Sequence, residues 1–352
     1  MSHKEKDMPK EKESKIISFI EQNPLCSSSD IHKKVLNEVS YATVKRILSK
    51  LASENLINKK GQGKGTKYII SPYYELFKPI QIEKYYEKEI DERIIKENYN
   101  PQILEILKDC TLFAVNESGK LQSLQNKFSK NIAQLTKTEY NKEFERLSID
   151  LSWKSSQIEG NTYSLLETER LLKEKETASG KSKEEAIMLL NHKDAIDFII
   201  ETPDYLVPLT ISKIEDVHSL LTKDLNVNRN IRTRRVGISG TNYRPIDNEF
   251  QIREALLNMC EIINQKEDIF EKSLIALGLI SYIQPFIDGN KRTARIVSNA
   301  ILINNKHCPI SFRTVDSVEY KKAMLLFYEQ NNIIAIKEIF INQFEFAVNT
   351  YF

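Results

Sequence analysis

The sequence has few cysteines and no long apolar run. Its four cysteines, at positions 26, 110, 260 and 308, form no CxxC pair and suggest no disulfide framework, so a reducing compartment fits. No run approaches the roughly 18 apolar residues of a membrane helix, and residues 1–10 are charged, without the apolar segment of a signal peptide. We therefore expect a cytoplasmic protein.

Histidine is also scarce, with five residues in the chain, at positions 3, 32, 192, 218 and 307. They are scattered, and none lies in the motif described below. We expect them to be structural or solvated. The alternative for His192 is that it approaches the motif from its predicted helical face. No cluster of metal-ligating cysteine and histidine is evident.

The charge is nearly balanced but unevenly distributed along the chain. The net charge of the 352 residues is +2, while residues 1–72 carry 14 Lys/Arg against 8 Asp/Glu, a balance of +6. This length, with 41% hydrophobic residues, suits a helical core plus a smaller module. We predict a basic module over 1–72, a linker over 73–100 that holds a solvated helix over 82–98, and a larger domain over 101–352.

Helical periodicity dominates the larger domain, so the predicted fold class is mainly α. The segment 295–303 is apolar nearly all round, which indicates a buried helix. The predicted helices span 101–109, 119–135, 137–158, 165–175, 182–200, 210–223, 249–265, 267–282, 291–305, 316–330 and 334–349.

The segment 284–295 places an acid, a Gly-Asn turn and two arginines at fixed spacing. If the residues after Asn290 are helical, Arg292 and Arg295 project from one face of the first turn. The free N–H groups and the positive end of the helix dipole point to the same place. Asp288 can bind a divalent cation through hard oxygen. Together these features predict a phosphate site.

This segment resembles the signature of the Fic (Fido) family, HxFx(D/E)GN(G/K)RxxR, matched at Phe286, Asp288, Gly289, Asn290, Lys291, Arg292 and Arg295. The resemblance implies a helical core from about residue 100 onward and transfer of AMP from ATP to a hydroxyl of a target protein, or of the chain itself. It also implies that Asp288 binds Mg²⁺. The Gly289-Asn290 turn would form an anion hole, and Lys291, Arg292 and Arg295 would complete the nucleotide-binding set.

One position departs from the signature, because Gln284 stands where the family carries a catalytic histidine. A neutral amide cannot accept a proton near pH 7, and a general base contributes about 10²- to 10⁴-fold. Positioning and charge stabilisation supply most of the acceleration in phosphoryl-type transfer. Three interpretations stay open: a slow AMP transferase, a nucleotide hydrolase, or a nucleotide-sensing site without turnover.

A second motif, at Ser155, Glu159 and Gly160, resembles the (S/T)xxxE(G/N) inhibitory motif that accompanies many Fic proteins. The resemblance implies an inhibitory helix over about 137–160 whose Glu159 pairs with Arg295 where the γ-phosphate would bind. A carboxylate and a phosphate compete for the same guanidinium fork. In the alternative interpretation, Gly160 is an ordinary residue after a helix end.

The segment 232–245 alternates apolar and small residues around Val236, Gly237 and Ile238, and Gly240 marks a turn. This pattern predicts a β-hairpin. It resembles the Fic flap, whose exposed edge would receive a target segment as an added strand. A structural hairpin that covers the core is the alternative.

The basic N-terminal module has its own pattern. Helices are expected over 13–22, after Ser27 and over 41–54, followed by strands near 56–60 and 66–70 that flank a glycine-rich turn. Three helices and a basic hairpin resemble the winged helix-turn-helix modules of bacterial regulators.

A winged helix of this kind would place its third helix in the major groove of DNA. We predict that Tyr41, Thr43 and Lys45 face the bases. The wing lysines that would contact phosphates are Lys59, Lys60, Lys64 and Lys67. Winged helices also act as protein-docking or dimerising modules, and a balance of +6 is modest for a DNA binder.

Overall fold

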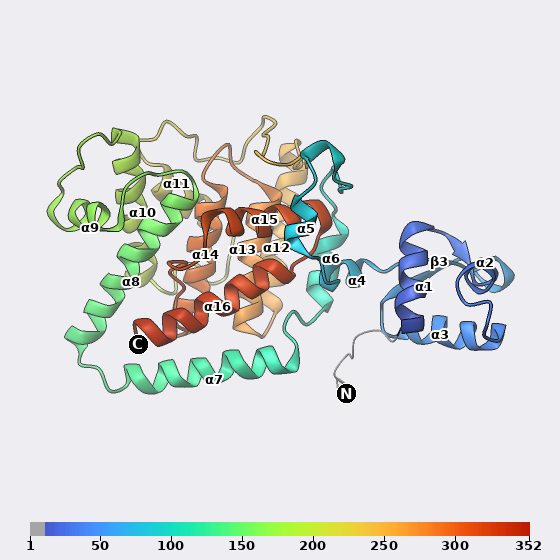
Figure 1. Cartoon of the computed structure of the whole chain (residues 1–352). Coiled ribbons are helices and arrows are strands. Elements are labelled where there is room, and N and C mark those ends of the chain that lie inside the picture. Colours follow the sequence, from blue (N-terminus) through green and yellow to red (C-terminus); the bar gives the residue numbers. More distant parts are fainter. Residues whose placement is uncertain (1–10) are drawn as a thin grey trace. The chain divides into compact units, whose positions relative to one another are not determined.

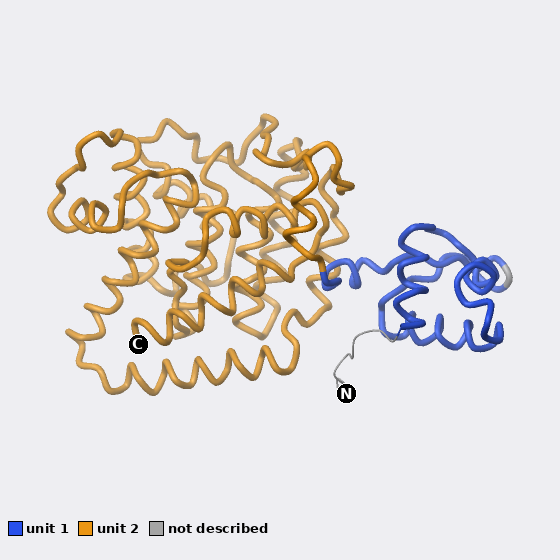
Figure 2. Tube along the Cα trace, in the orientation of Figure 1, with its two compact units in different colours: residues 1–79 blue, residues 80–352 orange. Residues whose placement is uncertain are grey.

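The computed structural model describes residues 11–352, apart from the side chain of Lys64. The charged stretch 1–10 considered above lies outside the described residues. The chain divides into two compact units, residues 1–79 and 80–352, which are described separately (Figure 2). Within residues 11–352, no helix is long and apolar enough to cross a membrane.

Unit 1 has the predicted winged-helix plan. Its elements are α1 (Glu11–Gln22), β1 (Cys26–Ser27), α2 (Ser28–Lys34), α3 (Tyr41–Ser53), β2 (Ile57–Lys60), η1 (Gly63–Gly65), β3 (Lys67–Ile70) and α4 (Pro72–Phe77). β3 lies between β1 and β2 and is antiparallel to both. The hydroxyls of Ser27 and Ser40 cap α2 and α3 by accepting backbone N–H groups. The three predicted helices and the wing are confirmed.

Unit 2 is almost entirely helical, as predicted, and every helix expected beyond residue 100 is present (Figure 1). Its elements are α5 (Ile82–Tyr86), η2 (Ile90–Glu92), α6 (Gln102–Asp109), α7 (Val115–Ile132), α8 (Lys137–Ile158), α9 (Leu165–Glu174), α10 (Lys183–Glu201), α11 (Ile211–Thr222), α12 (Glu249–Gln265), α13 (Ile269–Ile283), α14 (Asn290–Asn304), α15 (Ser317–Gln330) and α16 (Ile334–Thr350).

The centre of unit 2 is the pair α13 and α14. Nearly every side chain of both helices is buried, which confirms the prediction of a buried helix after Asn290. α8, α10 and α11 pack against α14, while α12, α15 and α16 pack against α13. Because α14 is enclosed on all sides, its N-terminus is held in a fixed place.

The solvated helix predicted over 82–98 is wrong. The chain forms only the short α5 and η2 there and then runs extended along α15. The charge alternation suggested a solvated face, but Tyr85 donates a hydrogen bond to Glu329 at 2.7 Å and Gln330 donates to the carbonyl of Ile94 at 2.7 Å. The carbonyl of Ile94 thus accepts a tertiary hydrogen bond in place of a helical one. We call residues 82–98 the strap.

The hairpin predicted over 232–245 is also wrong, because the described segment contains no β-strand. The expected turn at Gly240 is present, with a φ of 89°. The guanidinium of Arg232 donates to the carbonyl oxygens of Gln284, Arg234 and Ile246, so the segment is held by a side chain and does not pair with itself. We keep the name flap for residues 232–245.

Candidate active site

The loop between α13 and α14 brings the motif residues together at a tight turn. Gln284 ends α13 in the left-handed region, and Gly289 enters the same region, with a φ of 80°, directly before α14. A Cβ at Gly289 would lie 3.2 Å from Cγ2 of Thr222, so both the space and the backbone require glycine. The first N–H groups of α14 have no acceptor within the helix.

The amide of Gln284 is engaged in holding this loop. Its Nε2 donates to the carbonyl of Ser281 at 2.5 Å, and its Oε1 accepts from Nδ2 of Asn290 at 2.9 Å. Asn290 also exchanges hydrogen bonds of 2.8 Å with the backbone of Phe286. Both ends of the Gln284 amide are thus satisfied, and it offers no group that can accept a proton near pH 7.

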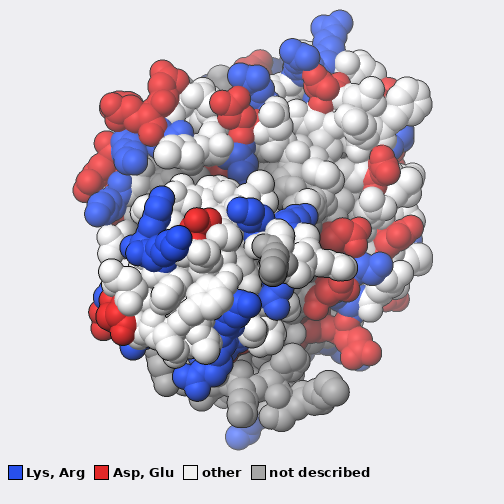
Figure 3. Space-filling model, turned by 90° about the vertical axis from the view of Figure 1, so that its right-hand side faces the viewer, with Lys and Arg blue, Asp and Glu red and all other residues white. Residues whose placement is uncertain are grey.

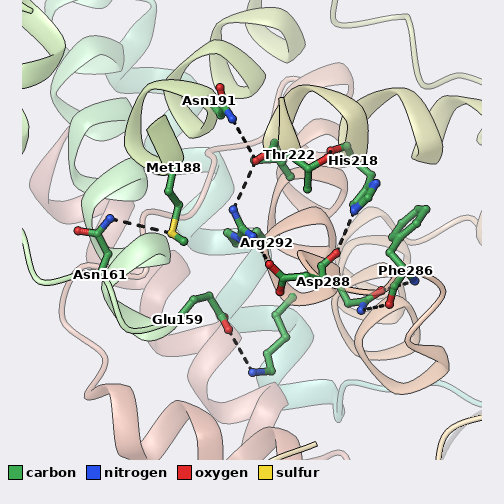
Figure 4. Close-up of polar contacts among 12 residues, drawn as sticks. Glu159, Asn161, Met188, Asn191, His218, Thr222, Phe286, Asp288 and Arg292 are labelled. Carbon is green, nitrogen blue, oxygen red and sulfur yellow. Dashed lines mark hydrogen bonds and ion pairs between the residues drawn. The ribbon is translucent and has the colours of Figure 1, made fainter. Parts of the chain in front are cut away.

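Asp288 and Arg292 face each other across the first turn of α14 (Figure 4). Nη2 of Arg292 lies 3.1 Å from Oδ2 of Asp288, and Nη1 donates to the carbonyl of Leu221 at 3.4 Å. The arginine side chain is buried, whereas that of Asp288 is 65% exposed. One carboxylate oxygen of Asp288 remains open to a cation.

Arg295 and Glu159 form the ion pair that the resemblance implied, with Nη2 and Oε1 2.8 Å apart. Lys291 is a second partner that was not foreseen, with its Nζ 3.1 Å from the other oxygen of Glu159. Burial opposes ionisation of this carboxyl group, but the charges of Arg295 and Lys291 outweigh burial and lower the pKa of Glu159 to about 2.

The end of α8 presents Glu159 to this cluster. The helix begins with a capping box at Thr136 and Glu139, and Glu159 is its last, capping residue. Gly160 follows with a φ of 104°, so it does serve as the residue after the helix end. Ser155, one turn earlier, accepts a hydrogen bond from Nε of Arg295 at 2.8 Å. Ser155 and Glu159 of this motif therefore both contact Arg295.

Two histidines lie beside the motif, a place that the sequence suggested only for His192, as an alternative. Nε2 of His192 lies 2.6 Å from Oγ of Ser155, and burial, followed by the charge of Arg295, lowers the pKa of His192 well below its usual value. His218 stacks on Phe286 with ring centroids 3.7 Å apart, and its Nε2 lies 2.9 Å from the carbonyl oxygen of Asp288. Lone histidines on apolar helix faces carry no signal that places them there.

The motif opens into a cleft of about 640 Å³. The strap, the flap, α15 and the loop before α14 each contribute to its lining, as does Glu159. The predicted docking residues Val236, Gly237 and Ile238 line this cleft. Among the described residues, no group of three His, Cys, Asp or Glu side chains is placed to hold a metal ion.

In unit 1, the predicted DNA-contacting side chains lie on the surface of α3 and β2. The hydroxyl of Tyr41 lies 2.7 Å from Oγ of Ser28, and Nζ of Lys45 lies 5.1 Å from the Tyr41 ring centroid. Thr43 bonds to the capping Ser40 at 2.9 Å. Lys59 and Lys60 are exposed, and the side chain of Lys64 is outside the described set. Basic side chains recur across the face shown in Figure 3.

Comparison with known proteins assigns each region to a family. Residues 208–302 match the Fic/DOC family. Residues 10–127 match the penicillinase repressor family, which covers the winged helix and extends into α7. Among solved structures, Fic-1 of Caenorhabditis elegans aligns over 71% of this chain and 80% of its own, at 20% identity and a TM-score of 0.58. A Fic-domain signaling protein of Bacteroides thetaiotaomicron aligns over 66% and 95%, at 18% identity and a TM-score of 0.57.

Curated relatives share a shorter region. The protein adenylyltransferase fic-1 of C. elegans is 25% identical over 170 residues, which are 46% of this chain and 33% of the relative. The protein adenylyltransferase Fic of Nematostella vectensis is 28% identical over 172 residues, 47% of this chain and 40% of the relative. The match thus spans a third to two fifths of these relatives. The chain carries a Fic/DOC family domain at residues 208–302 and a penicillinase repressor-type winged helix near its N-terminus.

Proposed function

We propose that unit 2 binds ATP and transfers its AMP to a protein hydroxyl, either on a target or on the chain itself. The observation that carries the proposal is the arrangement around Glu159. Two cations, Arg295 and Lys291, converge on one carboxylate at the N-terminus of α14. A carboxylate here occupies a place suited to a phosphate, because both present oxygens to the same guanidinium fork. The adenylyltransferase names of the curated relatives support the same activity.

The residues present also fit Mg²⁺ together with a nucleotide. Asp288 has an exposed carboxylate at the mouth of the loop. Nη1 of the buried Arg295 has no hydrogen-bond partner among the described residues. Mg²⁺ is held by one or two carboxylates plus substrate phosphates. Asp288 would hold the ion, which would supply charge neutralisation between phosphates when bound.

In the transfer, the hydroxyl oxygen of the target bonds to the α-phosphorus while the bond to the β-phosphate oxygen breaks and pyrophosphate leaves. The proton of the hydroxyl needs an acceptor, and the amide of Gln284 cannot take it. The proton therefore passes to solvent, which makes the reaction slow. With water as the attacking hydroxyl, the same site would act as a nucleotide hydrolase.

Glu159 inhibits the site in this proposal. Its carboxylate holds both cations, and an incoming phosphate has to displace it. The deciding experiment incubates the wild type and the Glu159→Gly variant with labelled ATP and Mg²⁺ and follows the label on protein. We expect labelling by the variant above the wild type. If ATP binds but neither protein acquires label, the transferase is excluded.

A nucleotide-sensing, DNA-binding regulator is the second candidate function. Two observations favour it: Gln284, whose amide is hydrogen-bonded at both its nitrogen and its oxygen, stands in place of a proton acceptor, and residues 10–127 match the penicillinase repressor family. In this case ATP would bind without turnover. The winged helix would bind duplex DNA, with Lys59 and Lys60 on phosphates.

Fluorescence anisotropy of the full chain with duplex DNA at several salt concentrations tests this candidate. Lys59→Gln with Lys60→Gln should weaken binding and reduce the salt slope by about one per lost phosphate contact. Lys12→Gln, on α1, is the control, because it removes one exposed charge outside the predicted contact residues. If DNA does not bind at low salt, the module is assigned to protein docking.

A further inference from the structure

The strap is fixed to α15 at a buried ion pair. Nη1 of Arg93 lies 3.2 Å from Oε1 and 3.4 Å from Oε2 of Glu329, and the two side chains are only 3% and 0% exposed. The hydroxyl of Tyr85 donates to Oε2 at 2.7 Å. Taking two charges out of water costs several kcal/mol per ion unless further hydrogen bonds compensate. A pair this deep therefore suggests a role beyond joining the strap to α15.

Arg93 makes that further contact with its other nitrogen. Its Nη2 donates to the carbonyl oxygen of Gly240, at the turn of the flap, at 2.6 Å. The guanidinium also lies over the ring of Tyr86, 5.1 Å from its centroid. The planar fork of arginine can serve two acceptors in fixed directions, which a lysine cannot do. One side chain thus connects α15, the strap and the flap.

The strap makes further contacts with the flap, through both side chains and the backbone. Nδ2 of Asn242 donates to Asp91 at 2.9 Å, and the backbone N–H of Arg244 donates to the carbonyl of Glu97 at 2.6 Å. Asn98 and Arg244 form an isolated parallel bridge. The strap therefore occupies the side of the flap formed by residues 240–244.

The other part of the flap, residues 236–239, forms no strand. Among the described residues, the N–H groups of 236–239 donate no hydrogen bond, and these residues line the cleft beside Asp288. With no strand pairing of its own, the position of this segment depends on its ends. Arg232 holds one end through three carbonyl groups, and Arg93 holds the other at Gly240.

We propose that Arg93 is a positioning residue that holds residues 236–239 over the cleft, in the place where an acceptor segment would lie. Its effect on transfer rests on the proposed function, whereas its effect on the flap does not. Arg93 contacts neither Asp288 nor the arginines of α14. It therefore acts on the acceptor side and not on the nucleotide.

Hydrogen exchange of the backbone amides in the full chain tests the positioning directly. Arg93→Lys keeps the charge beside Glu329 but loses the fork. We expect exchange of the hydrogen-bonded flap amides of Tyr243 and Arg244 to rise about tenfold, the size of one lost charge-assisted hydrogen bond, and exchange in α13 and α14 to stay unchanged. The double variant Arg93→Met with Glu329→Leu removes the buried charges together and should give the same local increase.

Glu83→Gln is the matched control, because Glu83 lies in the strap and makes an exposed ion pair with Lys322. It should leave exchange in the flap unchanged. Unchanged exchange of the Tyr243 and Arg244 amides in Arg93→Lys and in the double variant would overturn the proposal. Increased exchange throughout unit 2 in both would also overturn it, because that result means Arg93 stabilises the unit as a whole.

Transfer measurements in the Glu159→Gly background extend the test. Arg93→Lys should lower the rate of AMP transfer from labelled ATP about tenfold and leave ATP affinity by calorimetry unchanged. A parallel loss of ATP affinity would contradict a role on the acceptor side. If the parent variant transfers no AMP, the proposed function fails while the exchange result still decides the role of Arg93.

Discussion

The cleft has an arginine–glutamate pair in each of two walls, and the two pairs differ in one respect. Arg295 and Arg93 are both buried. The carboxylate of Glu159 is 19% exposed and faces the cleft, whereas that of Glu329 is fully buried and bonded to Tyr85. A phosphate can displace the first carboxylate from the solvent side. It has no route to the second.

Because of this difference in exposure, a ligand can replace the carboxylate of the Glu159–Arg295 pair, whereas the Glu329–Arg93 pair serves to stabilise the structure. Glu159 ends a helix and is held by side-chain charges, so it can move aside with little rearrangement of α8. Glu329 lies within α15 among buried aromatic residues and cannot leave without unpacking the core. The exposure of the acid, and not that of the arginine, decides which pair can respond to a ligand.

Breaking the supporting pair should have the largest effect. Arg93→Ala leaves Glu329 as an unpaired buried charge, and we expect the free energy of unfolding of unit 2 to fall by about 3 to 5 kcal/mol. Urea unfolding measures this loss. Glu83→Gln, which removes only an exposed ion pair, should change it by less than about 1 kcal/mol. Equal losses in the two variants would mean that burial does not distinguish these pairs.

Placing a general base at position 284, in the cleft between the two ion pairs, should have the next largest effect, which is on the rate of AMP transfer. In the Glu159→Gly background, Gln284→His should raise AMP transfer by about 10²-fold, within the range of a general base. The gain should decline in acid, because a protonated imidazole cannot accept a proton. Quantifying the labelled protein over time from labelled ATP at several pH values measures both effects.

Gln284→Ala is the control for that substitution. If its rate matches that of the parent, the amide only holds Asn290, whereas a further loss means that it also orients the attacking hydroxyl. An unchanged rate in Gln284→His, with ATP still bound, would contradict a transferase that lacks only its base and would favour the nucleotide-sensing regulator.

Breaking the Glu159–Arg295 ion pair should have a smaller effect, which is on ATP affinity. Glu159→Gly frees Arg295 and Lys291, and we expect ATP affinity to rise about tenfold, or about 1.4 kcal/mol. Arg295→Ala should weaken ATP binding with or without the first change. Titration calorimetry with ATP and Mg²⁺ decides both outcomes. An affinity that Glu159→Gly leaves unaltered, together with unaltered transfer, would remove the inhibitory assignment.

The smallest expected effect is that of pH on the difference in ATP affinity between Glu159→Gly and the wild type. The pKa of Glu159 is lowered to about 2, so its interaction with the two cations is complete above its ordinary pKa near 4.5 and is lost only as the pH falls toward 2. Calorimetry between about pH 6 and pH 8 should therefore give a constant ratio of ATP affinities for Glu159→Gly and the wild type. A ratio that falls steadily toward pH 6 would show that Glu159 gains a proton in this range.

The sequence predicted those elements that depend on residues close together in the chain. The helix after Asn290 was readable from an apolar segment behind a Gly-Asn turn, and the winged helix from caps and periodicity in the first 72 residues. The pairing of Glu159 with Arg295 came from a resemblance, since no periodicity connects residues 136 positions apart. The partnership of Lys291 was not foreseen, because it depends on where the end of α8 lies.

Amino-acid sequence alone determined the helical class, the winged helix and the composition of the phosphate loop, because caps, turns and apolar spacing act over a few residues. Tertiary structure decided the strap, the flap and the surroundings of Gln284. The strap forms hydrogen bonds with Glu329 and Gln330 where a helix was predicted. The flap is held by carbonyl contacts of Arg232 and Arg93 where a hairpin was predicted. Such contacts join residues far apart in the chain, so no local pattern reports them.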